Sequence, residues 1–179
     1  MKNRLTDKYI KEVVPELKKS FGYTNNLAVP RLEKVVLNVG ISSKNADPKF
    51  LENVESGLQR ISGQKPVRTL ARLAISNFKI RQGQVVGLMV TLRGQRMYQF
   101  VDKLVSISLP RVRDFRGLEA KSLDDKGNLN IGFKENLAFP EIKADEMERT
   151  FGLEVAIKTT AKNKAEGLAL LKLLGFPIK

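Results

Sequence analysis

Apolar residues recur along the chain at two spacings, about four residues and two residues. The segment 2–21 has an apolar residue at every fourth position: Leu5, Tyr9, Val13, Leu17 and Phe21. This spacing predicts an amphipathic helix. Pro15 removes a backbone donor inside that helix, so we expect a break or kink there. Residues 25–30 then form a linker.

The spacing of two predicts the strands. In Leu32–Ile41, the apolar residues Val35, Leu37 and Val39 would share one side of a strand. Three further strands are expected: Lys65–Leu70, Val85–Arg93 and Leu153–Thr159. Residues 71–84 fit neither spacing, and a connection of this length is more often functional than idle.

Helices are predicted between these strands. Asp47-Pro48 is typical of a helix start, and Gly63 is typical of the end of that helix. Further helices are expected over Gly94–Leu109, stopped by Pro110, and over Lys162–Leu174. The residues expected to face inward from Gly94–Leu109 are Met97, Phe100, Val101, Leu104 and Ile107.

The order of elements is helix, then β-α-β-β-α-β, then helix. This order predicts an α+β fold with the split β-α-β arrangement of ferredoxin-like domains, an antiparallel sheet with helices on one face. An N-terminal helix, an insertion before the last strand and a C-terminal helix are added to it. We expect a single domain with three parts: an N-terminal helix and linker at 1–30, a core at 31–109 and 152–179, and an insertion at 110–151.

Charge is distributed unevenly along the chain. Arg60–Arg116 carries twelve Lys or Arg and two acids, a local charge of +10 out of +13 for the whole chain. Gly117–Ile157 reverses the sign, with nine acids against five bases. Dense positive charge favours a polyphosphate partner, because each phosphate contact releases condensed counterions. The acidic stretch indicates a second and different partner, such as a basic protein.

The amino-acid composition limits the catalytic and metal-binding groups that the chain can offer. The chain has no Cys and no His, so it lacks thiolate nucleophiles, disulfides, the usual general base and the usual transition-metal ligands. An enzyme could still be built from carboxylates, Lys, Ser and Mg²⁺, but these absences weigh against catalysis. We expect no enzyme activity, no metal and no cofactor. The sequence shows neither a signal-peptide h-region nor an apolar run of membrane-spanning length, so we expect a cytoplasmic protein without a membrane partner.

The sheet face opposite the predicted core is the first candidate for RNA binding. It would present Lys34, Asn38, Thr91 and Arg93, a polar and basic set that suits RNA. Asn38 favours a functional role, because Asn is a poor strand former in mid-strand. The alternative is an ordinary solvated sheet face.

The long connection at 71–84 is the second candidate. It places Arg72, Lys79 and Arg81 around Phe78, and cations beside an aromatic ring suit RNA backbone or an unstacked base. A plain solvated hairpin loop is an equally good interpretation.

The insertion holds three further groups of interest. In Pro110–Arg116, Arg side chains near Asp114 could bind phosphate or simply hold the insertion in place. Asp124–Asn128 lacks the ligand spacing of a calcium loop, and we interpret it as a hairpin turn. An acidic cluster, either a docking patch for a basic protein or a solvated edge, comprises Glu141, Asp145, Glu146 and Glu148.

Three classes of function compete on this sequence. A structural RNA-binding protein fits the charge pattern best. A nuclease-like enzyme using carboxylates and Mg²⁺ would need paired acids at strand ends, whereas the acids gather in the insertion. A peripheral membrane protein would need an apolar and basic helix with aromatics, and Lys162–Leu174 has no aromatic residue.

Several segments, taken in order, closely resemble one known family. They are LEKVVLNVGI, ISGQKPVRTLAR, FKIRQGQVVG, VTLRGQRMYQFVDKLVSISLPRVRDFRGL, DDKGNLNIGFKENLAFPEI and LLKLLGFP. The family is the bacterial large-subunit ribosomal protein number five, which binds 5S rRNA. The similarity runs over nearly the whole chain, with similar spacing between the segments.

The resemblance implies a structural role without chemistry. The protein would attach 5S rRNA to the central protuberance of the large subunit, contact 23S rRNA and peptidyl-site tRNA, and bridge to small-subunit ribosomal protein thirteen, as a monomer within the ribosome. The implied 5S rRNA contacts are Lys34, Asn38, Gln64, Lys65, Thr91 and Arg93. The implied tRNA contacts in the loop are Arg72, Lys79 and Arg81. The implied bridge lies around 136–148 and includes the acidic cluster.

This sequence departs from the family at one point. The family often has two Lys near the start of the tRNA loop, where Leu73 and Ala74 stand here. The positive charge of the loop is lower as a result.

Overall fold

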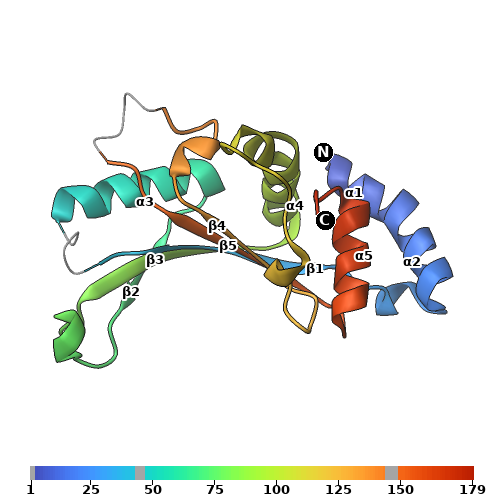
Figure 1. Cartoon of the computed structure of the whole chain (residues 1–179), viewed down its shortest axis with the longest axis horizontal. Helices are drawn as coiled ribbons and strands as arrows, with labels where there is room; N and C mark the ends of the chain where they lie inside the picture. The colour runs from blue at the N-terminus through green and yellow to red at the C-terminus, as the bar shows by residue number, and fades with distance from the viewer. Residues whose placement is uncertain (1–2, 43–46, 144–148) are drawn as a thin grey trace. The chain divides into compact units, whose positions relative to one another are not determined.

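The computed structural model describes residues 3–42, 47–143 and 149–179. The strands form a five-stranded sheet in the order β2-β3-β1-β5-β4 (Figure 1). Their bounds are β1 Leu32–Gly40, β2 Val67–Leu70, β3 Val85–Leu92, β4 Leu129–Phe133 and β5 Leu153–Thr159. With a helix after β1 and another after β3, the order β2-β3-β1-β5 is the expected ferredoxin-like arrangement, so the predicted fold class is confirmed.

The chain forms two compact units. The first comprises residues 1–35, 92–131 and 156–179, and the second comprises residues 36–91 and 132–155. The first unit holds the helices α1 Arg4–Lys8, α2 Val14–Phe21, α4 Gly94–Lys103 and α5 Lys164–Leu174. The second unit holds α3, Pro48–Ser62.

The N-terminal helix of the first unit has the expected fault near Pro15. Between α1 and α2 the chain makes a π-helical turn, Tyr9–Val13, and Pro15 lies at the start of α2. Proline has no N–H for the helix ladder, and a wider π turn accommodates the missing bond without ending the helix. Leu5, Val13 and Leu17 are buried, as the fourfold spacing predicts.

The helix predicted over Gly94–Leu109 differs from the expectation at one inward position. Met97, Phe100, Val101 and Leu104 are buried as predicted, but Ile107 is 43% exposed. After α4 the chain enters another π-helical turn, Leu104–Ser108. Ser108, four residues after the buried Leu104, is buried in this turn in place of Ile107.

In the second unit, α3 lies along one side of the strands (Figure 1). Its first turn is capped by Asp47, which accepts from the Lys49 amide, and Gly63 ends it with φ +66°. The apolar side of α3 and the inward side chains of β1 and β3 form one core. Its buried members include Leu37, Val39, Val54, Leu58, Ile61, Leu88 and Val90.

Two strands differ from the sequence prediction. β4 was not predicted, because Asn130 and Gly132 on its exposed side have low strand propensity, although Leu129, Ile131 and Phe133 alternate inward. β2 begins at Val67, two residues later than expected. Pro66 has no N–H and cannot donate to the sheet ladder before that point.

The Asp124–Asn128 segment is a hairpin turn, as predicted. Leu123 and Leu129 pair across it, and an Asp124 carboxylate oxygen accepts from the amides of Lys126 (3.0 Å) and Asn128 (2.8 Å). The turn packs closely on the start of α5. A Cβ atom at Gly127 would lie 2.8 Å from the Cα of Gly167, a distance that real Cβ contacts do not reach.

We predict that Gly167→Ala lowers the stability of the protein by about 1–3 kcal/mol, because the new methyl group must push the backbone of the 124–128 turn away from α5. Thermal melting of the purified variant measures this. Gly132→Ala is the matched control, since a Cβ atom there has no neighbour within 4 Å. Equal melting temperatures for the two variants would contradict the close packing of Gly127 and Gly167.

Candidate nucleic-acid interface

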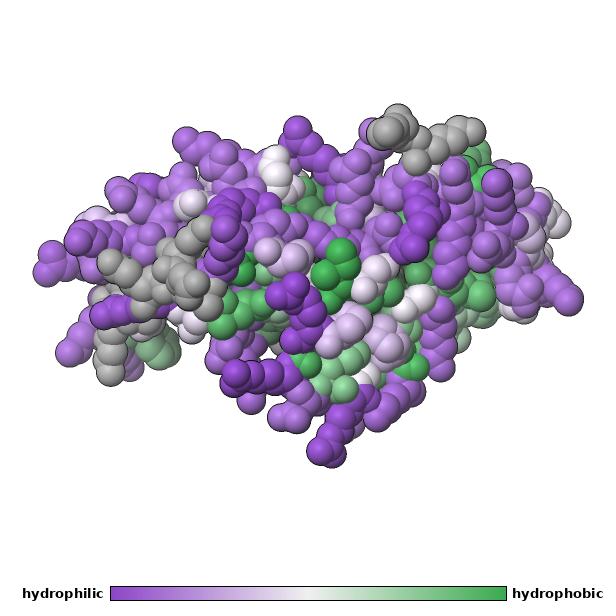
Figure 2. Space-filling model, turned by 90° about the horizontal axis from the view of Figure 1, so that it is seen from above, coloured by the Kyte–Doolittle hydropathy of each residue, from purple (hydrophilic) through white to green (hydrophobic). Residues whose placement is uncertain are grey.

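The basic stretch lacks acidic residues over a long interval. Between Glu55 and Asp102 the sequence has eight Lys or Arg and no Asp or Glu. Hydrophilic side chains cover most of the face seen in Figure 2, with hydrophobic residues in smaller patches between them. The cations of the acid-free stretch attract a polyanion over distances up to about 10 Å at moderate salt.

In the second unit, four predicted RNA contacts lie near the covered core but outside it. Asn38 and Thr91 are half-buried between fully buried neighbours on β1 and β3. Strand alternation therefore directs them to the face opposite the core. Gln64 is also half-buried, and its side-chain amide donates to the Thr91 carbonyl at 3.4 Å. Lys65 is exposed beside it.

The turn that carries Gln64 and Lys65 is held by Ser62. The Ser62 hydroxyl donates to the carbonyl of Leu58 (2.6 Å) and lies within hydrogen-bond distance of the Gln64 carbonyl (2.9 Å) and amide (3.2 Å). Together with the left-handed backbone of Gly63, these bonds fix the chain where it leaves α3. The positions of Gln64 and Lys65 are thus set by local structure.

In the first unit, Lys34 and Arg93 lie around a single acid, Glu33. The Lys158 ammonium is 3.0 Å from the Glu33 carboxylate across β1 and β5. The pKa of Glu33 is lowered, first by the hydrogen bond from Lys158 and then by the charges of Lys158, Lys34 and Arg93. Three cations therefore act on one carboxylate near the start of β1.

Arg93 also precedes the first turn of α4. Its side chain makes no capping hydrogen bond, and the first turn of α4 contains no acid. Gly94 has φ +57°, and Arg96 is exposed on the first turn. The partial positive charge of this helix start is therefore reinforced by two arginines.

The loop at 71–84 is an ordered extension of the β2–β3 hairpin. At its base, Ala71 N donates to the Gln84 carbonyl (2.8 Å), and Gly83 N donates to the Ala71 carbonyl (2.9 Å). Nearer the tip, Ile75 and Ile80 exchange two backbone hydrogen bonds of 2.9 and 3.1 Å. The predicted tRNA contacts Arg72, Lys79 and Arg81 are all exposed on this loop.

The arginine segment of the insertion is exposed at Arg111, Arg113 and Arg116. Asp114 adopts a left-handed backbone with φ +54°. Among the described residues, no ion pair joins Asp114 to a neighbouring arginine. The segment therefore turns through its backbone, and its guanidinium groups face solvent.

The acidic cluster is described only in part. Glu141 is half-buried after a short 3₁₀ turn, Asn136–Ala138. Asp145, Glu146 and Glu148 lie outside the described residues.

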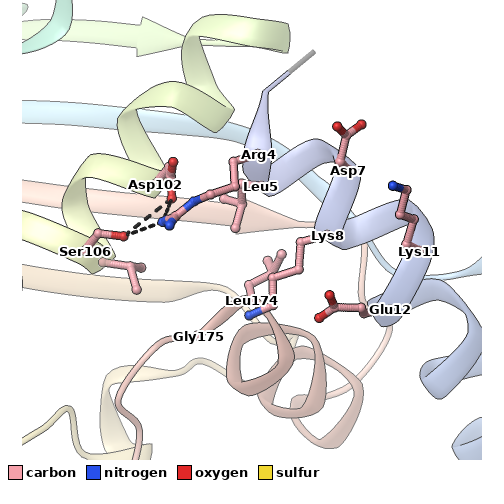
Figure 3. Close-up of a pocket in the computed structure, with 11 residues that line it drawn as sticks. Arg4, Leu5, Asp7, Lys8, Lys11, Glu12, Asp102, Ser106, Leu174 and Gly175 are labelled. Atoms are coloured by element: carbon pink, nitrogen blue, oxygen red, sulfur yellow. Dashed lines mark hydrogen bonds and ion pairs between the residues drawn. The ribbon is translucent and has the colours of Figure 1, made fainter.

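A pocket of about 480 Å³ lies within the first unit, between α1, the following π turn, α4 and the end of α5 (Figure 3). Arg4 donates to Asp102 (2.6 Å) and to Ser106 (2.9 Å) across it. The Asp102 carboxylate is thus paired with the Arg4 guanidinium. No cluster of acids suited to a metal occurs in the part of the chain that the structure describes. The hydrogen bonds of Arg4 join the N-terminal helix to the α4 segment across this pocket.

None of the helices in the described ranges is long and apolar enough to cross a membrane.

This chain is similar to known proteins over nearly its whole length. Residues 25–81 match the family Ribosomal protein L5, and residues 85–178 match the ribosomal L5P family C-terminus. The chain is 53% identical over 175 residues to large ribosomal subunit protein uL5 of Caldanaerobacter subterraneus subsp. tengcongensis, covering 98% of each. It is 51% identical over 179 residues to uL5 of Ralstonia pickettii, covering 100% of this chain and 99% of that protein.

A ferredoxin-like sheet with basic surfaces and an acid-free hairpin defines an RNA-binding protein. The chain belongs to the ribosomal protein L5 family. Members of this family are structural ribosomal proteins and not enzymes, so the predictions of a non-enzymatic role and of a place on the cytoplasmic ribosome are confirmed. Ribosomal RNA is accordingly a partner of this protein.

We predict that Lys158→Ala raises the pKa of Glu33 toward its ordinary value, because it removes the hydrogen bond and the nearest charge. An NMR titration that follows the Glu33 carboxyl carbon measures the shift. Lys172→Ala, which removes an exposed cation from α5, should leave it unchanged. Because folding lowers this pKa, the stabilisation is present at neutral pH and is lost as the pH falls through the pKa of Glu33. An unchanged titration in Lys158→Ala would contradict the pairing.

Proposed function

We propose that this protein is a structural constituent of the large ribosomal subunit that binds 5S rRNA and attaches it to the central protuberance. In the second unit the proposed contacts are Asn38, Gln64, Lys65 and Thr91. In the first unit they are Lys34 and Arg93. The proposal is carried by one observation: Asn38 and Thr91 lie on the uncovered strand face, and Gln64, Lys65, Thr91 and Arg93 fall within a stretch of 46 residues that has no acid.

The chemistry of these side chains suits folded RNA. Asn38, Gln64 and Thr91 offer donors and acceptors to base edges and 2′-hydroxyl groups, and Lys65 offers charge to phosphate. Val36 and Met89 share the strand face with them and are half-buried. Because no aromatic residue stands on this face, recognition rests on hydrogen bonding, charge and shape rather than on base stacking.

The same proposal assigns other surfaces to other partners. The exposed cations of the 71–84 loop contact peptidyl-site tRNA, and the arginines at 111, 113 and 116 suit contact with 23S rRNA phosphate. The acidic cluster of Glu141, Asp145, Glu146 and Glu148 bridges to small-subunit ribosomal protein thirteen, a basic partner. Within the ribosome the protein is a monomer.

We predict that Asn38→Ala and Arg93→Ala each weaken 5S rRNA binding by about 1–3 kcal/mol while leaving the thermal melt nearly unchanged. Arg93→Ala should also reduce the slope of log affinity against log salt by about 0.7–1, because one phosphate contact is lost. Titration of purified protein with 5S rRNA across a salt series, with tRNA and an unrelated stem-loop as competitors, measures both effects.

Matched controls come from α3, on the covered side of the sheet. Asn53→Ala removes the same amide group as Asn38→Ala, and Lys49→Ala removes one positive charge as Arg93→Ala does; both should leave 5S rRNA binding unchanged. If the strand-face variants bind as tightly as the wild type, the 5S surface lies elsewhere. If any RNA displaces 5S rRNA equally, the protein binds polyanions without selecting 5S rRNA.

We predict that Glu146→Lys combined with Glu148→Lys impairs the joining of the two ribosomal subunits, because it places cations against a basic partner. Sedimentation of purified subunits at limiting Mg²⁺ measures joining. Glu16→Lys combined with Asp125→Lys changes the net charge equally at exposed positions and serves as control. Normal joining by the first pair would remove the docking role of the acidic cluster.

A further inference from the structure

Exposed large apolar side chains are concentrated at the β2–β3 hairpin. Of the nine large hydrophobic residues that are exposed in the described chain, five lie in β2 and its loop: Val67, Leu70, Leu73, Ile75 and Phe78. Leu73 is 74% exposed and Phe78 is 66% exposed. Single exposed apolar residues are ordinary on protein surfaces, but a group within twelve residues marks a binding surface.

The backbone holds these side chains outward in an ordered arrangement. The paired Ile75 and Ile80 close a tip of four residues, in which Ser76–Phe78 form a 3₁₀ turn. Lys79 then takes a left-handed backbone with φ 54°, and its amide donates to the Ser76 carbonyl at 3.0 Å. A left-handed conformation is costly for a residue with a side chain. The backbone hydrogen bonds of Ile75, Ile80 and Lys79 order the tip, which reduces the entropy lost on binding.

Charge selects the class of partner. The loop carries Arg72, Lys79 and Arg81 and no acid, so it favours a negatively charged partner. An anion that also offers apolar surface is a nucleotide whose base is not stacked in a helix. Stacking of an unpaired base on an aromatic side chain strengthens such binding and suits any base, because every base has a π face.

We propose that the loop of the hairpin binds its RNA partner mainly by nonpolar contact of Leu73, which precedes the Ile75–Ile80 pair, and of Phe78 in the tip with an unstacked nucleotide, and that Arg72, Lys79 and Arg81 orient the backbone around it. This inference rests on the proposed contact of the loop with peptidyl-site tRNA. Leu73 stands where the family often has Lys, so apolar surface replaces a positive charge at this position of the loop. Binding at the tip therefore depends less on salt than binding by charge alone.

The test uses ribosomes purified from cells whose only copy of the protein is the wild type or a variant. The dissociation constant of peptidyl-site tRNA is measured over a salt series for Leu73→Ser, for Phe78→Ala, and for the triple variant Arg72→Gln, Lys79→Gln, Arg81→Gln. Leu27→Ser is the matched control, because Leu27 is 81% exposed in the short 3₁₀ turn Asn26–Ala28, outside the hairpin.

We expect Leu73→Ser and Phe78→Ala each to weaken tRNA binding roughly tenfold with an unchanged salt slope. The triple variant should lower the salt slope and weaken binding less at high salt, and Leu27→Ser should match the wild type. If only the triple variant weakens binding, the nonpolar inference is overturned while the tRNA contact survives. If no variant changes binding, the loop does not contact tRNA. Uptake of the wild-type protein, but not of Phe78→Ala, by anionic phospholipid vesicles would instead assign the tip to a membrane surface and overturn the inference.

Discussion

The burial of alternate residues of β1 and β3 beneath α3 is the constraint on which the second unit depends. Leu37, Val39, Leu88 and Val90 are at most 1% exposed. Burial of each such side chain contributes about 1.5–3 kcal/mol. A slip of one residue in either strand would exchange the two faces, so this core also fixes the outward direction of Asn38 and Thr91. The proposed binding face is thus a consequence of core packing, and its polar residues need no stabilising contacts of their own.

Elements with a strong periodic pattern could be predicted from the sequence. β5 has the predicted bounds, and α3 begins and ends at its predicted capping residues, because alternation and capping are local properties. The π turn Leu104–Ser108 could not be predicted, since the apolar spacing of this segment is also that of an uninterrupted α-helix. β4 was missed for a related reason: Asn130 and Gly132 have low strand propensity, and the strand forms because its inward residues are buried beside β5.

The candidate surfaces were predicted to different degrees. Charge and alternation indicate Asn38, Thr91 and the loop cations without any structure. The sequence does not reveal that Phe78 and Leu73 are held outward by paired backbone segments, because an apolar residue in a loop could equally fold back on the sheet. Charge density identifies the class of partner, whereas the exposed apolar residues indicate which part of that partner is bound.

Glu33 is an acid among the cations of the proposed RNA-binding surface in the first unit. Its carboxylate lowers the net positive charge around Lys34, Arg93 and Lys158, and so reduces long-range attraction for any RNA. It also holds the Lys158 ammonium at 3.0 Å, which restricts a flexible side chain before RNA arrives. Exposed ion pairs contribute little to stability, so the effect of this pair on folding is small. Weaker attraction to every RNA, combined with cations already in position, favours an RNA whose phosphates match that arrangement over one that is merely negative.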